Sequence, residues 1–224
     1  MEMIYKAARL EKQAMSESEL TLINKQSLRE LSADEVFAFR LAACDNQVDR
    51  DNERFTENTL EQLAKLYIGK TVLLDHVWSA KSQTARIYNA YVSGEGDVKR
   101  LILCCYTVRT ESMADTISAI EGGILRECSV GCTVEHVLCS ICGADQRTTL
   151  CQHRGGHEYD GKICHFDLVD ACEAYEVSLV AVPAQPVSLK RSAMAVPREK
   201  NPMRRAAQTI KSAGRTKPRS RLKK

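Results

Sequence analysis

A cysteine-rich stretch spanning residues 139–165 limits the possible folds of this chain more than any other feature. It opens with Cys139 and Cys142, and a second close pair, Cys151 and His153, follows after eight residues. Two such pairs of soft ligands can surround a zinc ion tetrahedrally. The stretch holds few other apolar residues, so a bound metal would supply the folding energy that a core cannot. We therefore predict a zinc-binding insertion here.

The zinc site is predicted to be structural, because four protein ligands leave no position open for water. We predict four ligands: Cys139, Cys142, Cys151 and His153. His157 and Cys164 remain open as substitutes for His153. A zinc hydrolase that uses His153, His157 and Glu158 is a rival interpretation. The abundance of cysteine argues against it, since sites made of thiolates are mostly structural.

Cysteine content also bears on the compartment. The chain has ten cysteines, and five of them lie between Cys128 and Cys151. No apolar run reaches the ~18 residues that a membrane helix requires, and residues 1–13 lack the apolar segment of a signal peptide. We expect a cytoplasmic protein that does not bind membranes, in which clustered cysteines indicate metal binding rather than disulfides.

The remainder of the chain consists of short apolar runs separated by polar turns, which favours a mainly β fold with a few helices. Strands are expected at 20–23, 36–43, 70–74, 85–92, 99–108, 124–132, 166–171 and 174–182. One helix should be capped by Thr56 and end at Gly69, with its apolar face formed by Leu60, Leu63, Ala64 and Tyr67. A second helix is expected at 112–120, and residues 1–34 are expected to be peripheral.

Three of these strands carry groups suited to acyl transfer. Ser129 lies in the strand at 124–132, His76 follows the strand at 70–74, and Glu176 lies near the start of the last strand. A serine, a histidine and an acid on separate strands can form a nucleophile, a base and an orienting carboxylate. Cys128 is a competing nucleophile, but neighbouring strand residues face opposite sides, so only one of the two can point at His76.

These stretches together resemble the prohead (capsid maturation) proteases of tailed bacteriophages, which are related in fold to the herpesvirus assemblin proteases. The matching pieces are Asp75-His76, Ser129-Val130-Gly131 and the run from Glu176 to Pro186. The resemblance implies an antiparallel β-barrel flanked by helices over residues 35–189, with the zinc-binding insertion at 139–165 as a departure from the family. It implies Ser129 as nucleophile and His76 as base. Glu176 is the most natural third member, with Asp167, Asp170 and His165 as alternatives.

Family resemblance also implies the biological setting. The enzyme would be a serine endopeptidase that cleaves scaffold protein, the scaffolding segment of the major capsid protein, and itself. It would act inside the assembling procapsid in the cytoplasm of a host bacterium, with no cofactor needed for catalysis, and the related herpesvirus proteases suggest a homodimer. The chain has no G-x-S-x-G motif, which argues against an α/β-hydrolase.

The C-terminal segment differs from the body in charge. Residues 190–224 hold 13 Lys and Arg and one acid, Glu199, a net charge of +12, whereas residues 1–189 carry 19 basic and 28 acidic residues, a net charge of −9. Such a tail is expected to be disordered. It can bind nucleic acid or an acidic scaffold through charge, or be trimmed by self-cleavage. A non-enzymatic zinc-knuckle protein that binds nucleic acid through this tail is therefore the alternative function.

Overall fold

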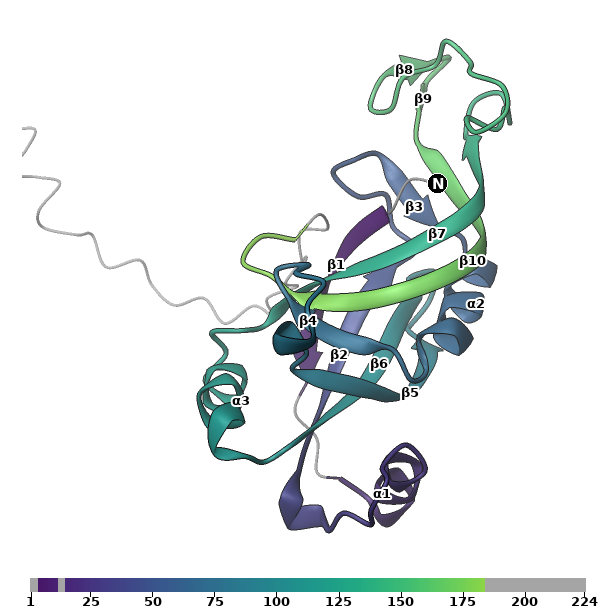
Figure 1. Cartoon of the computed structure of the whole chain (residues 1–224). Coiled ribbons are helices and arrows are strands. Elements are labelled where there is room, and N and C mark those ends of the chain that lie inside the picture. Colours follow the sequence, from purple (N-terminus) through teal and green to yellow (C-terminus); the bar gives the residue numbers. More distant parts are fainter. Residues whose placement is uncertain (1–3, 12–14, 184–224) are drawn as a thin grey trace, which may run out of the picture. The chain divides into compact units, whose positions relative to one another are not determined.

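The computed structural model describes residues 4–11 and 15–183, and it is an α+β fold built on one curled, half-barrel sheet (Figure 1). The strands of the sheet are β1 (Ile4–Glu11), β2 (Val36–Asp45), β3 (Glu53–Phe55), β4 (Thr71–Leu74), β5 (Ala85–Ser93), β6 (Arg100–Val108), β7 (Glu127–Cys139) and β10 (Phe166–Leu179). A separate small hairpin is formed by β8 (Glu158–Tyr159) and β9 (Lys162–Ile163). The α-helices are α1 (Glu17–Asn24), α2 (Glu57–Tyr67) and α3 (Ala114–Glu121), and short 3-10 turns cover Ala33–Glu35, Ala80–Ser82 and Glu111–Met113.

The sheet is mixed. Its strand order is β3-β10-β4-β5-β6-β2-β1-β7, and β7 also pairs with β10. Most pairs are antiparallel, but β10 runs parallel to both β3 and β4. The predicted antiparallel barrel is therefore corrected to a curled mixed sheet. Parallel pairing needs a long connection between the strands, and here more than 90 residues separate β4 from β10 and β3 from β10, so this requirement is met.

The core lies between the inner face of this sheet and α2. Thr56 caps α2 as predicted, because its side chain accepts a hydrogen bond from the Thr59 N–H. The predicted apolar face of the helix is confirmed, since Leu60, Leu63, Ala64 and Tyr67 are all buried. Burial of a leucine side chain of this kind contributes about 1.5–3 kcal/mol. The helix packs mainly against β10 and β5, and so fixes the strand that carries Glu176.

The N-terminal part of the chain contradicts two expectations. Residues 4–11 are not peripheral, because β1 lies within the sheet between β2 and β7. The strand expected at 20–23 is wrong, since these residues lie in α1. Ser16 and Glu19 form a capping box there, in which each side chain bonds the other's backbone N–H. This local capping outweighs the β-propensity of the short apolar run.

Other expected elements are confirmed with small shifts in their bounds. The hairpin of β5 and β6 is present, and β2, α3 and β4 lie where the patterns place them. The two last predicted strands form one continuous strand, β10, which ends at Leu179. Within the described residues, no helix is long and apolar enough to span a bilayer. The basic segment 190–224 lies outside the described residues.

Candidate functional site

The pairing of β7 with β10 places four polar or small residues on one face of the sheet. Ser129 is opposite Ser178, and Gly131 is opposite Glu176. Directly opposed residues of antiparallel strands share a face, and residues two apart on a strand do so as well. Ser129, Gly131, Glu176 and Ser178 therefore face the same side. Ser129 is buried, at 4% exposure, and β1 runs beside it, with Ala7 as its partner on that strand.

His76 reaches the same face from the end of β4. Its Nδ1 lies 2.8 Å from Oε1 of Glu176, whose side chain is almost fully buried, while the imidazole is 25% exposed. A carboxylate only accepts hydrogen bonds, so the ring donates its Nδ1–H. That tautomer leaves Nε2 as the basic nitrogen. The structure thus joins two of the three residues predicted to act together.

Ser178 is hydrogen-bonded to both His76 and Glu176. Its hydroxyl donates to Oε2 of Glu176 at 2.5 Å and accepts the His76 backbone N–H at 3.1 Å. Asp75 and His76 both have positive φ, 50° and 55°, a conformation that is uncommon for residues other than glycine. The Asp75 N–H donates to the Leu179 carbonyl at 3.1 Å. Two hydrogen bonds that β10 accepts, one at the Ser178 hydroxyl and one at the Leu179 carbonyl, therefore support the turn that carries the imidazole.

Gly131 makes room for the carboxylate. A Cβ atom on this glycine would lie 2.7 Å from Oε1 of Glu176, closer than real contacts allow. Its carbonyl accepts a hydrogen bond of 2.9 Å from the buried Tyr67 hydroxyl on α2. The glycine of the Ser129-Val130-Gly131 motif is thus required by the side chain opposite to it.

The competing nucleophile, Cys128, faces the other way. Its partner on β10 is Leu179, and both side chains belong to the apolar core. Burial raises the pKa of the Cys128 thiol well above its usual value. A protonated, buried thiol is unreactive. The geometry therefore excludes Cys128 as the group that faces His76.

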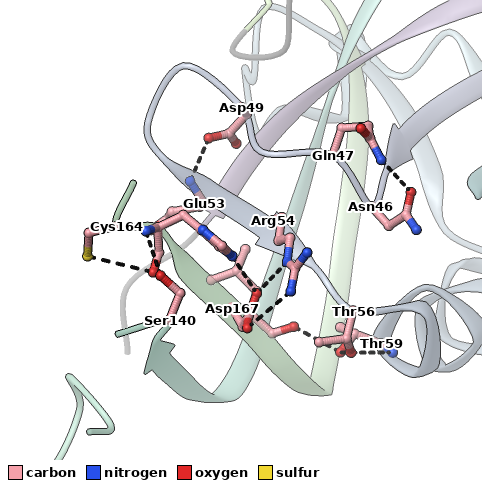
Figure 2. Close-up of polar contacts among 12 residues, drawn as sticks. Asn46, Gln47, Asp49, Glu53, Arg54, Thr56, Thr59, Ser140, Cys164 and Asp167 are labelled. Carbon is pink, nitrogen blue, oxygen red and sulfur yellow. Dashed lines mark hydrogen bonds and ion pairs between the residues drawn. The ribbon is translucent and has the colours of Figure 1, made fainter. Parts of the chain in front are cut away.

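The alternative third members lie far along β10 from His76. Asp167 is nine residues from Glu176, about 30 Å along an extended strand, and it forms an ion pair with Arg54 of β3 (Figure 2). His165 Nε2 lies 3.5 Å from an oxygen of that same Asp167. Asp170 accepts a hydrogen bond from Gln62 of α2. Asp167 and His165 lie at the β3 end of β10 and Asp170 contacts α2, whereas Glu176 is the acid that contacts His76.

A second cluster lies at the opposite ends of β7 and β10, where the cysteine-rich stretch projects from the sheet (Figure 1). The ligand atoms of Cys139, Cys142, Cys151 and His153 all lie within 4.8 Å of one another. Cys139 Sγ is 3.6 Å from His153 Nδ1. The four predicted ligands are thus brought together, and this cluster can hold a metal ion.

The first cysteine pair sits in a tight turn. The Gly143 N–H donates to the Cys139 carbonyl, and Gly143 has a φ of +73°, which glycine adopts without strain. Although burial acts to raise it, the pKa of the Cys139 thiol is lowered by hydrogen bonds from the backbone N–H groups of Cys142 and Ile141. Backbone donors that stabilise a thiolate suit metal ligation.

The substitute ligands behave differently from each other. Cys164 is buried, with its Sγ 3.9 Å from that of Cys139, so it adjoins the cluster. Within the described residues, His157 and Glu158 belong to neither of the two groups of side chains that could hold a metal, the second group being Glu135, His136 and Asp170. The His153 ring packs edge-on against Tyr159 of β8, with centroids 4.5 Å apart. The arrangement therefore does not favour the hydrolase centre of His153, His157 and Glu158.

A further pair, His136 and Asp145, connects the cysteine-rich stretch to the sheet. His136 Nδ1 lies 2.8 Å from Asp145 Oδ2, and the other oxygen of Asp145 accepts the Val137 N–H at 3.1 Å. The hydrogen bond from His136 lowers the pKa of Asp145 to about 2, and the same bond raises the pKa of His136. The cysteine-rich stretch is thus anchored on β7 independently of its thiols.

Comparison with protein-family models, curated proteins and solved structures finds no match for this chain.

Ser178 is the site residue that the sequence analysis missed. The signal available was the alternation of β10, which places residue 178 on the face of Glu176. The bond to the His76 backbone depends on the parallel pairing of β4 with β10, a contact between segments 102 residues apart. Local pattern alone does not reveal such a contact.

Proposed function

We propose that the protein is a serine endopeptidase of the prohead protease kind, with Ser129 as nucleophile, His76 as base and Glu176 as the third member. One observation carries the proposal. The imidazole of His76 is hydrogen-bonded to buried Glu176 on the sheet face shared by Ser129. An acid, an imidazole and a serine in this relation form the working parts of acyl transfer.

The chemistry follows from these groups. His76 takes the proton of the Ser129 hydroxyl as its oxygen attacks a peptide carbonyl, and it returns a proton to the leaving amine. Glu176 fixes the tautomer and stabilises the imidazolium as it forms. Ser178 occupies the second oxygen of Glu176, so the carboxylate has a single orientation toward the ring. Water then releases the acyl group by the same steps.

The fold supports the same proposal. From β10 the pairings run through β4, β5, β6, β2 and β1 to β7, which pairs again with β10. We propose that this curled sheet is a variant of the family's barrel, and that the ion held by Cys139, Cys142, Cys151 and His153 is structural zinc. Three thiolates and an imidazole suit zinc.

We also propose the substrates and the setting that the family resemblance implies. They are scaffold protein, the major capsid protein and the enzyme itself, inside a procapsid in a bacterial cytoplasm, with a homodimer as the expected assembly. The basic segment 190–224 would attach the enzyme to acidic scaffold or nucleic acid through its net charge of +12.

A fluorophosphonate probe tests the proposal, because it labels activated serines. We expect wild type to be labelled at Ser129, and Ser129→Ala and His76→Ala to lose labelling by at least about 1,000-fold. Ser118→Ala, an exposed serine on α3, is the matched control and should label normally. Peptide mapping locates the adduct. Labelling that survives in Ser129→Ala, or an adduct on Cys128, would contradict the assignment.

Self-cleavage gives a second readout. Intact mass of wild type, expressed with candidate scaffold and capsid proteins, should show trimmed products that Ser129→Ala leaves whole. Equal trimming in both samples would assign the cleavage to another enzyme.

A further inference from the structure

A cavity of about 460 Å³ adjoins Glu176 on the side of β4. Its lining residues come from the start of β4, the turn that follows His76, the first residues of β5, and β10. The lining residues are Gly69, Lys70, Thr71, Leu73, Trp78, Ser79, Ala80, Gln83, Arg86, Tyr175 and Glu176. The cavity shares Glu176 with the candidate catalytic site, whereas Ser129 and His76 are not among its lining residues, so a group bound there would lie next to that site.

The charged groups of the lining are mainly cationic. Lys70 and Arg86 both contribute, and within residues 4–11 and 15–183 no ion pair of either cation is found. Arg86 is held in place, since its Nη1 donates to the Gly69 carbonyl and its Nη2 to Gln83 Oε1. The carboxylate in the lining, Glu176, is already bound by His76 and Ser178.

The polar groups of the lining favour an acceptor as ligand. Gln83 Oε1 accepts hydrogen bonds from both Thr71 and Arg86. The side-chain oxygen of Gln83 is therefore occupied, and its amide nitrogen is the end left to bind a ligand. Lysine, arginine and an amide nitrogen are all donors. A carboxylate, which only accepts, matches this set.

Two of the lining residues, Trp78 and Tyr175, are aromatic. The rings of Trp78 and Tyr175 pack with centroids 5.7 Å apart, and Trp78 is 59% exposed. A large exposed indole beside a cavity provides apolar surface at little conformational cost. It suits the methylene stem of a side chain whose end is polar.

From these contacts we propose that the cavity is a specificity subsite that binds an acidic side chain of the substrate, next to the bond to be cleaved. The inference rests on the proposed endopeptidase function, and it adds the class of residue that the enzyme selects. The carboxylate binds Lys70 and Arg86 through charge-assisted hydrogen bonds, and its stem lies on Trp78.

The test uses the chain's single tryptophan as a reporter. Acetylated and amidated alanine pentapeptides with a central Glu, Gln or Lys are titrated into Ser129→Ala, so that binding is measured without cleavage. We expect the Glu peptide to change the Trp78 fluorescence saturably, with a Kd about five- to tenfold lower than that of the Gln peptide. The preference should shrink as salt rises.

Variants identify the cations. Lys70→Met and Arg86→Met should each reduce the preference for Glu over Gln to about twofold or less, whereas Lys25→Met, at the C-cap of α1, should keep it. Equal affinities for the Glu and Gln peptides in the parent protein, or a preference that survives in both pocket variants, would overturn the proposal.

The two proposals fail in different ways. If the protein prefers the Glu peptide but is not labelled at Ser129, the cavity binds acidic side chains and the protease proposal fails. If the protein is labelled at Ser129 but responds to none of the peptides, the protease proposal stands and the subsite proposal fails.

Discussion

Ser178 shows how one buried hydroxyl can organise a site. The turn at Asp75 and His76 adopts left-handed backbone angles, which cost on the order of 1–3 kcal/mol per residue unless the surroundings hold them. Ser178 supplies part of that support through the His76 N–H, and it also fixes Glu176. It therefore contacts both the backbone of His76 and the carboxylate that is bonded to its imidazole.

We expect Ser178→Ala to lower the rate of Ser129 labelling by about 10- to 100-fold, because hydrogen bonds to charged groups contribute about 1.5–3 kcal/mol. A positioning role predicts that kcat falls while KM changes little, and that Ser178→Thr, which keeps the hydroxyl, recovers part of the rate. Thermal unfolding is measured in parallel. A labelling loss fully explained by unfolding, or no loss at all, would assign Ser178 a purely structural role.

At the scale of elements, the helix face and the cysteine turn could be predicted from residues close together in the sequence. The face of α2 follows from four apolar residues at helical spacing, and the pair Cys139 and Cys142 with its glycine forms the tight turn expected of it. The acid that meets His76 was also identified, since Glu176 lies on the strand that pairs with β4. The first two depend on a few neighbouring residues, whereas the contact between Glu176 and His76 joins residues 100 apart in the chain.

The errors lie where distant segments decide the outcome. Nothing within residues 4–11 indicates a place between β2 and β7, and the parallel direction of β10 beside β4 depends on the path of the intervening chain. The misassignment of α1 is different, because Ser16-Glu17-Ser18-Glu19 is a capping-box sequence that predicts a helix start. That sequence favours the observed helix over the strand expected from the short apolar run at 20–23.

If the cysteine-rich stretch holds the proposed zinc ion, its structure should depend on that ion. We expect one zinc per chain by native mass spectrometry, and its loss in Cys142→Ser or on chelation, because a tetrahedral site cannot easily lose a ligand. Cys172→Ser, outside the cluster, is the matched control and should keep the ion. Cys164→Ser decides between the two ligand sets, since the ion is retained if His153 is the fourth ligand.

Hydrogen exchange shows which part of the structure depends on the metal. After chelation, amides of residues 139–165 should lose protection while those of β5 and β6 keep it, because the sheet has its own core. Unfolding of the whole chain on metal removal would contradict this, and so would full protection of 139–165 in the metal-free protein.

At the scale of the whole molecule, the fold is completed by a strand from the start of the chain. β1 pairs with β7 from Ile4 to Arg9 and with β2 from Arg9 to Glu11, and it lies directly beside the strand that carries Ser129. Its removal would expose the edges of two central strands at once, and unpaired backbone groups at such edges are costly. The candidate active site therefore depends on residues distant from it in sequence.

We expect a chain lacking residues 1–14 to lose most of its stability, since an internal strand contributes a large share of the ~5–15 kcal/mol that stabilises a typical domain. Circular dichroism should show a thermal transition lowered by well over 10 °C or absent, and Ser129 should not be labelled. A synthetic peptide of residues 1–14 should restore both properties, because it can pair again between β2 and β7. A truncated protein that melts like wild type and is labelled normally would show that β1 lies on the sheet without supporting it.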